Sequence, residues 1–148
     1  MFETQDEQAL RGLINTFVEG WNAGDGVACG RPFAADADFT AVTGLHVQGR
    51  DLIARGHTEI LSTVFRGTRI RPMVDRIRFL KPDVALMHVT LTFEVPPRFE
   101  VQPTSLGVVA AKDANGWSIV DFRNLMPFSR PLAGPLERQL METPVAAR

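Results

Sequence analysis

The chain has 148 residues, of which 45% are hydrophobic, and this is enough for one globular domain with a hydrophobic core. Its 16 basic and 17 acidic residues give a formal net charge of -1, so there is no electrostatic reason to expect nucleic acid or an anionic membrane as a partner. Cys29 is the only cysteine, which excludes an intrachain disulfide.

The first predicted element is a helix within residues 6–25. Residues 1–10 lack the basic and then apolar pattern of a signal peptide, and no apolar run is long enough to span a membrane, so we expect a cytoplasmic protein. Gly24 suits the left-handed position that ends a helix, and Asp25 can cap a second, short helix towards Arg31. The apolar stripe of the first helix recurs at intervals of three and four residues: Leu10, Leu13, Ile14, Phe17, Val18 and Trp21.

Two short strands are predicted next, over residues 37–42 and 45–49, with a turn between them. A helix from Arg50 to Phe65 follows. Its apolar face consists of Ile53, His57, Ile60, Leu61 and Val64. Because His57 follows Ile53 by four residues, the imidazole lies on the apolar face of this helix.

The remaining pattern predicts strands over residues 69–80, 84–95, 104–113 and 117–128. The last two strands pair across Asn115-Gly116, a strong hairpin signal. Three prolines make residues 96–103 an outer loop or edge, and the alternating arginines of the first strand predict a solvated or interfacial face. Residues 129–148 form a tail, docked or mobile, with a short amphipathic piece from Leu136 to Met141.

This order of elements predicts a single α+β domain over residues 1–128. The four antiparallel strands must curve, and the N-terminal helices must cover their concave side. We therefore expect a cone-shaped, curved antiparallel sheet wrapped around a pocket.

Several short motifs follow one another at ordinary spacings: WNAGD (Trp21–Asp25), FAADADF (Phe33–Phe39), VTG, GRDLI (Gly49–Ile53), His57, PDVALMH (Pro82–His88), GWSIVDF and Asn124. In this succession the chain resembles the nuclear transport factor 2-like superfamily, and within it the SnoaL-like proteins, particularly the small SgcJ/EcaC-type group. The resemblance runs from the first helix to Pro127. It implies a pocket at the open end of the cone and a homodimer formed through the sheet. It does not name a reaction, because the superfamily includes isomerases, dehydratases, cyclases, epoxide hydrolases and non-catalytic binders.

His57 and Asn124 are the candidate catalytic residues. A neutral imidazole in an apolar pocket can remove a proton, orient water or anchor a ligand, although a half-buried histidine bonded to a neighbouring strand would give the same pattern. In the last strand, alternation groups Asn124 with Val120, Phe122 and Met126, so it points inward if they do. We predict that His57 and Asn124 share one pocket.

The predicted ligand-binding residues are Trp21, Thr40, Met87, Phe93 and Phe122. The alternative for Trp21 is core packing. For the strand that contains Thr40, the sequence leaves open whether Asp38 and Thr40 or Phe39 and Ala41 face the pocket. His46 and His88 are expected at the surface. No histidine pair has metal-ligand spacing, and there is no phosphate-binding loop or nucleophile elbow, so no metal or cofactor is expected.

Departures from the enzymes of this superfamily disfavour some reactions. The resemblance places Ala41 where ketosteroid isomerases carry their carboxylate base, and this chain has no tyrosine for their oxyanion hole or for a scytalone-dehydratase type of site. Asp121 and Arg123 could imitate part of the Asp-Arg-Asp set of epoxide hydrolases, but strand alternation turns them away from the pocket.

Three hypotheses of function follow. The first is a binding protein for a small apolar or polyketide-like ligand, with a pocket lined by His57 and Asn124. The second is a cofactor-independent isomerase, cyclase or hydrolase that uses His57 as its base. The third is a dimerisation module.

Overall fold

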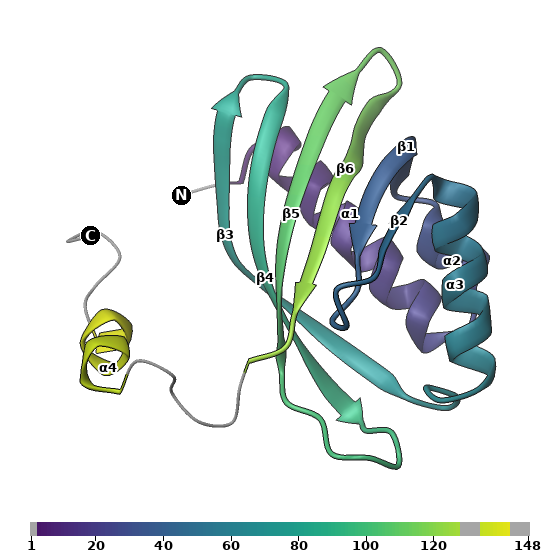
Figure 1. Ribbon diagram of the computed structural model, residues 1–148. Helices are drawn as coiled ribbons and strands as arrows, with labels where there is room; N and C mark the ends of the chain where they lie inside the picture. The colour runs from purple at the N-terminus through teal and green to yellow at the C-terminus, as the bar shows by residue number, and fades with distance from the viewer. Residues whose placement is uncertain (1–2, 128–133, 143–148) are drawn as a thin grey trace.

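The structure is a computed structural model that describes residues 3–127 and 134–142. Its elements follow the predicted order of helices, strand pair, helix and four-stranded meander (Figure 1). The helices are α1 (Gln5–Asn22), α2 (Gly26–Gly30), α3 (Arg50–Ser62) and α4 (Pro135–Glu142). The strands are β1 (Phe33–Thr40), β2 (His46–Gln48), β3 (Arg69–Lys81), β4 (Val84–Val95), β5 (Thr104–Asp113) and β6 (Gly116–Leu125).

All six strands form one sheet in the order β2-β1-β6-β5-β4-β3. The sheet curves without closing, and the three N-terminal helices cover its concave side, which confirms the predicted α+β cone (Figure 1). The prediction of an antiparallel sheet is wrong at one pair, because β1 and β6 run parallel. These two strands are joined by α3 and the whole meander, so no hairpin dictates their relative direction.

The helix ends have local causes. Thr4 caps α1 by accepting a hydrogen bond from the Glu7 N–H, and Asp25 caps α2 as predicted. Gly24, at φ 67°, occupies the left-handed position expected after α1. Helix α3 ends at Ser62, earlier than predicted, because the hydroxyls of Ser62 and Thr63 bond back to the Glu59 carbonyl and compete with the helical pattern.

Two bulges shift the predicted faces of the strands. In β3 the register slips between Val74 and Arg76, so Met73 is 60% exposed although Ile77 packs against the core. In β6 the slip leaves Val120 without a partner, and Ile119 is fully buried instead. Strand β1 begins at Phe33, four residues before the predicted start.

The core is one cluster between α1, α3 and the concave face of the sheet. Strand β4 contributes Ala85, Met87, Val89 and Leu91, in the predicted alternation with exposed His88. Cys29 is fully buried, and burial raises the pKa of its thiol to about 12, so it behaves as a small hydrophobic residue. Among the described residues, no helix has the length and apolarity that a membrane span requires.

The tail begins beyond this core. Helix α4 spans the segment from Leu136 to Met141, for which the sequence predicts a short amphipathic piece. Whether the tail docks or stays mobile is untested, since residues 128–133 and 143–148 lie outside the described part of the chain.

Gly26 allows α2 to lie directly against the backbone of α3. A Cβ atom added at Gly26 would stand 2.2 Å from the backbone nitrogen of Thr58 and 2.6 Å from its Cα. Any side chain there must therefore push the two helices apart. Gly12 in α1 differs, because an added Cβ would meet nothing within 4 Å.

We expect Gly26→Ala to destabilise the protein by about 1–3 kcal/mol, because the clash is with backbone and cannot be relieved by a rotamer change. Gly12→Ala is the matched control and should stabilise by up to about 1 kcal/mol through helix propensity alone. Urea unfolding followed by circular dichroism measures both. Equal effects of the two substitutions would contradict the proposed close contact.

Candidate functional site

The helices and the concave face of the sheet enclose a cavity of about 400 Å³. Its wall combines residues from α1, α3 and all six strands with the loops at one end of the cone. Most of the lining is aromatic or aliphatic, and among the described lining residues there is no Asp, Glu, Lys or Arg. Five large hydrophobic residues of the lining are also substantially exposed and lie at the mouth: Val42, Leu45, Leu52, Val64 and Met126.

His57 lines this cavity from α3 and is only 5% exposed. Its Nδ1 lies 2.8 Å from the carbonyl oxygen of Ile53, one turn earlier in the helix. A carbonyl can only accept, so Nδ1 carries the proton and donates it. In the neutral ring Nε2 is then a free acceptor, and it has no hydrogen-bond partner within the described residues. The sequence left open a half-buried histidine bonded to a neighbouring strand. In the structure the imidazole bonds within its own helix instead.

Burial lowers the pKa of His57 below its ordinary value of 6.5, and the hydrogen bond to Ile53 opposes this only in part. The imidazole is surrounded by aromatic rings: its centroid is 5.1 Å from that of Phe39, 5.4 Å from Phe17 and 6.1 Å from Trp21. These rings stand edge to face with it, and no charged lining residue is available to stabilise an imidazolium. His57 is therefore held in the neutral form.

Asn124 lines the same cavity from the end of β6. Its Oδ1 is buried and has no hydrogen-bond partner in the described part of the chain. A buried carboxamide oxygen without a partner costs about 1–3 kcal/mol, which is uncommon in a folded protein. The structure thus places His57 and Asn124 on one cavity, each with an unused acceptor atom.

Trp21 contributes its ring to the wall, and its N–H is used elsewhere. The indole Nε1–H donates to the Thr68 hydroxyl over 3.0 Å, and that hydroxyl donates to the Phe65 carbonyl. The next residue, Asn22, bonds both the N–H and the carbonyl of Ile70. Trp21 is therefore an apolar wall and an anchor of α1 rather than a hydrogen-bond donor to a ligand.

The remaining predicted ligand-binding residues divide between the cavity and the core. Phe93 lines the cavity. Met87 and Phe122 are fully buried in the core behind its wall and do not line it, so these two predictions are corrected. Thr40 is also corrected: Phe39 and Ala41 face the cavity, and strand alternation therefore turns Thr40 to the other side of the sheet.

Several lining residues were not predicted from the sequence. Phe65, beyond the end of α3, stacks on Phe93 with ring centroids 5.9 Å apart. Thr104 is a buried polar residue at the start of β5, and Val101 comes from the proline-rich loop. Positions after a helix, within a loop or at the first residue of a strand lack the flanking periodicity that identifies inward residues.

The charged groups of the neighbouring strands lie on the convex face. Arg123 is exposed and donates to Asp121 over 2.9 Å, and fully buried Phe122 lies between them in sequence. This confirms that the pair faces away from the cavity. His46 is exposed and bonded to Asp38, as expected of a surface histidine. Among the described residues, no three His, Cys, Asp or Glu side chains gather in a group that could hold a metal ion.

Comparison with solved structures identifies similar folds. A domain of unknown function with a cystatin-like fold from Nostoc punctiforme is 30% identical, with a TM-score of 0.79, and the match covers 99% of this chain and 91% of that one. An uncharacterised protein with a cystatin-like fold from Caulobacter vibrioides is 24% identical, with a TM-score of 0.78 and coverage of 93% and 99%. An NTF-2 like protein of unknown function from Shewanella oneidensis is 13% identical, with a TM-score of 0.68 and coverage of 80% and 98%. No protein-family profile and no curated protein matches the chain.

The lowered pKa of His57 makes the stability of the protein depend on pH. Below about pH 6.5 the unfolded chain binds a proton at His57 that the folded chain does not, so the free energy of unfolding should fall as the pH decreases. The loss approaches about 1.4 kcal/mol per pH unit and ends at the folded pKa.

This dependence can be assigned by substitution. His57→Asn retains an N–H donor for the Ile53 carbonyl and should remove the slope, whereas His88→Asn, on the exposed face of β4, should retain it. Long-range proton–nitrogen NMR correlation should also show the Nδ1–H tautomer. A protonated Nε2 at pH 7 would contradict the assigned hydrogen bond.

Proposed function

Because the chain shares the fold of nuclear transport factor 2-like proteins, we propose that it is a small-molecule-binding protein whose ligand occupies the cavity of the cone. The observation that carries this proposal is the cavity itself. It has a volume of about 400 Å³, and its wall is apolar except for a few polar groups, among them His57 and Asn124. Ligand sites in proteins have this size and this composition.

Binding without turnover is favoured over catalysis by the surroundings of His57. A neutral imidazole is a competent base, but a base that removes a proton needs a partner to stabilise the charge that develops on the substrate. Among the described lining residues no charged side chain can do so, which leaves only the uncharged donors of Asn124, Thr43 and Thr104. The position expected of an isomerase base holds Ala41, which lines the cavity and has no proton acceptor.

The exposed mouth supports entry of an apolar ligand. Leu45 is 64% exposed and Val64 is 58% exposed, and both continue into the lining of the cavity. An apolar molecule would cover these side chains as it enters, and each buried Å² of apolar surface contributes roughly 25 cal/mol. The rim is thus suited to a ligand of the small apolar or polyketide-like class.

Trp21 provides a reporter for this proposal. The sequence has two tryptophans, and only Trp21 lines the cavity, so Trp117→Phe leaves one reporter. We expect the neutral fluorescent probe N-phenyl-1-naphthylamine to brighten on binding and to quench Trp21. Gly56→Leu should weaken binding about tenfold or more, because Gly56 lines the cavity and a Cβ added there meets nothing within 4 Å, so the leucine side chain can extend into the space of the ligand.

Gly12→Leu is the matched control, since Gly12 also has free space around its Cβ but lies outside the lining. It should leave probe affinity unchanged. A probe that brightens without quenching Trp21, or that binds Gly56→Leu as tightly as the parent, would refute a ligand site in the cavity.

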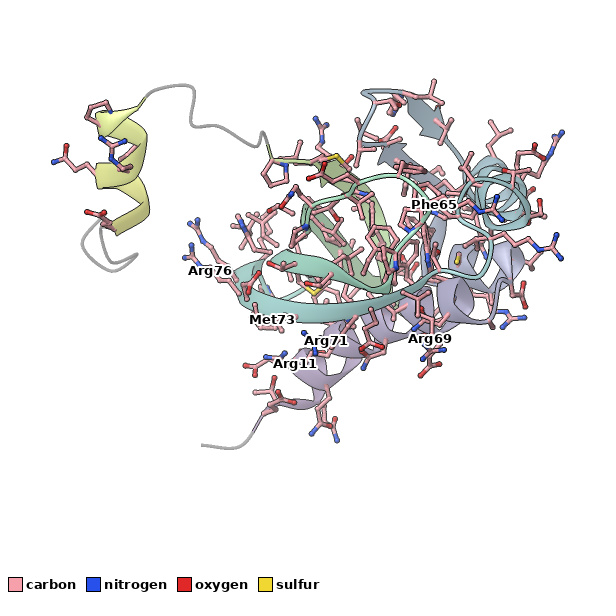
Figure 2. The ribbon with its side chains drawn as sticks, turned by 90° about the horizontal axis from the view of Figure 1, so that it is seen from below. Arg11, Phe65, Arg69, Arg71, Met73 and Arg76 are labelled. Atoms are coloured by element: carbon pink, nitrogen blue, oxygen red, sulfur yellow. The ribbon has the colours of Figure 1, made fainter. Side chains whose placement is uncertain are left out.

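The convex face supports a second role, pairing with another copy of this chain. Its centre on β4 and β5 carries only uncharged side chains, and the flanking strands carry Arg76, Arg78, Asp121 and Arg123. Arginines also follow one another along the edge strand β3 around exposed Met73 (Figure 2). An uncharged centre with a charged rim is the usual composition of a protein interface. The central residues are Leu86, His88, Thr90, Ser105, Gly107, Val109 and Ala111.

Val109→Glu should therefore convert a dimer into a monomer, because it places two buried charges near the centre of the contact. Val27→Glu on α2 is the control, since Val27 is already 61% exposed and lies away from the sheet. Sedimentation velocity measures both variants. A parent protein that sediments as a monomer would contradict pairing through this face.

A further inference from the structure

The polar atoms of the cavity are few, and their hydrogen-bonding roles can be assigned. Four lining residues carry polar side chains: His57, Asn124, Thr104 and Thr43. The threonine hydroxyls can donate or accept and so set no preference. The ring nitrogens of His57 can be assigned from the hydrogen bond to Ile53, and Asn124 contributes a buried carboxamide oxygen without a partner.

The Nε2 atom of His57 is fixed as an acceptor. Nδ1 donates to the Ile53 carbonyl over 2.8 Å, so the proton of the neutral ring is already placed. Rotating the ring would break that bond and leave the imidazole N–H without an acceptor among the surrounding aromatic rings. The surrounding rings of Phe17 and Phe39 offer Nε2 no donor.

The Oδ1 atom of Asn124 is a second acceptor without a donor. Its neighbours across the sheet are Leu106 on β5, which is buried, and residues of an apolar rim. A ligand that donates a hydrogen bond would remove the cost of leaving this oxygen unpaired. A ligand that can only accept hydrogen bonds would bring a second lone pair towards the Asn124 oxygen.

The charge of the ligand is also restricted. A carboxylate or phosphate would enter a hollow with no Lys or Arg among its described lining residues, and the desolvation of such an anion would be uncompensated. An ammonium would likewise find no carboxylate. The cavity therefore selects for neutral molecules.

We propose that the ligand is a neutral aromatic or alicyclic alcohol, whose hydroxyl donates a hydrogen bond to Nε2 of His57 or to Oδ1 of Asn124 while its rings lie against Trp21, Phe65 and Phe93. This inference rests on the proposed function and specifies the chemical class that the cavity accepts. The hydroxyl is both donor and acceptor, so it can also take a hydrogen bond from Thr104 or from the Asn124 amide.

Four naphthalene probes that share one ring system test the class: 2-naphthol, 2-methoxynaphthalene, 2-acetonaphthone and 2-naphthoate. Equilibrium dialysis against the full chain measures each affinity from the absorbance of the probe. We expect 2-naphthol to bind about tenfold more tightly than the ether and the ketone, which only accept, and 2-naphthoate to bind most weakly. In His57→Asn, which retains the donor to Ile53 and removes Nε2, the advantage of 2-naphthol should fall several-fold.

A measurement on the unaltered protein covers the case in which His57→Asn does not fold. The Nε2 nitrogen resonance of His57 should shift on addition of 2-naphthol and stay in place on addition of 2-methoxynaphthalene. Equal affinities of the alcohol, ether and ketone, or tighter binding of the ketone, would overturn the alcohol class while leaving the cavity as a binding site. Failure of all four probes to bind would overturn both this inference and the proposed function.

Discussion

The cavity depends on how the end of α1 is tied to the first residues of β3. Asn22 satisfies both backbone groups of Ile70 through its carboxamide, and Trp21 reaches Thr68 with its indole N–H. These bonds join residues almost fifty positions apart in sequence, each contributing on the order of 1 kcal/mol. They hold the helix across the concave face at one end of the cone. This attachment therefore sets the space between the helix and the sheet. Side-chain packing alone would tend to close that space.

This attachment also explains why a polar histidine is tolerated inside. Trp21, fixed by Thr68, presents its ring to His57, and Phe17 lies one turn earlier on the same helix. The imidazole meets the protein's polar groups only through Ile53 of its own helix. An aromatic surround and one internal hydrogen bond keep the ring neutral and leave its outer nitrogen unused. Folding alone does not require that nitrogen, since a leucine would fill the same space without a desolvation cost.

The sequence predicted those features that rest on local periodicity. The stripe of α1, the position of His57 on α3 and the alternation along β4 follow from spacings of 3.6 and 2 residues, and the structure confirms them. Predictions failed where one residue breaks the period, as at Val120 in β6, or where a strand has two plausible faces, as at Thr40. Phe122 and Met87 point inward as expected. At their position along the strands the interior is packed core, and the cavity begins only nearer the open end of the cone. Depth along a strand depends on the curvature of the whole sheet, which no local pattern records.

The two faces of the sheet therefore serve different purposes, and the alternation of each strand keeps them apart. On β6, Phe122 is buried in the core and Asn124 lines the cavity, whereas exposed Arg123 is paired with Asp121 on the convex side. A single slip of register would carry the carboxamide to the outside and a guanidinium into the apolar hollow. The bulge at Val120 precedes this segment. It therefore determines which of the last residues of β6 point to the interior and which point to the convex side. Because an inward Arg123 would introduce a cation, the neutral character of the cavity depends on that one extra residue.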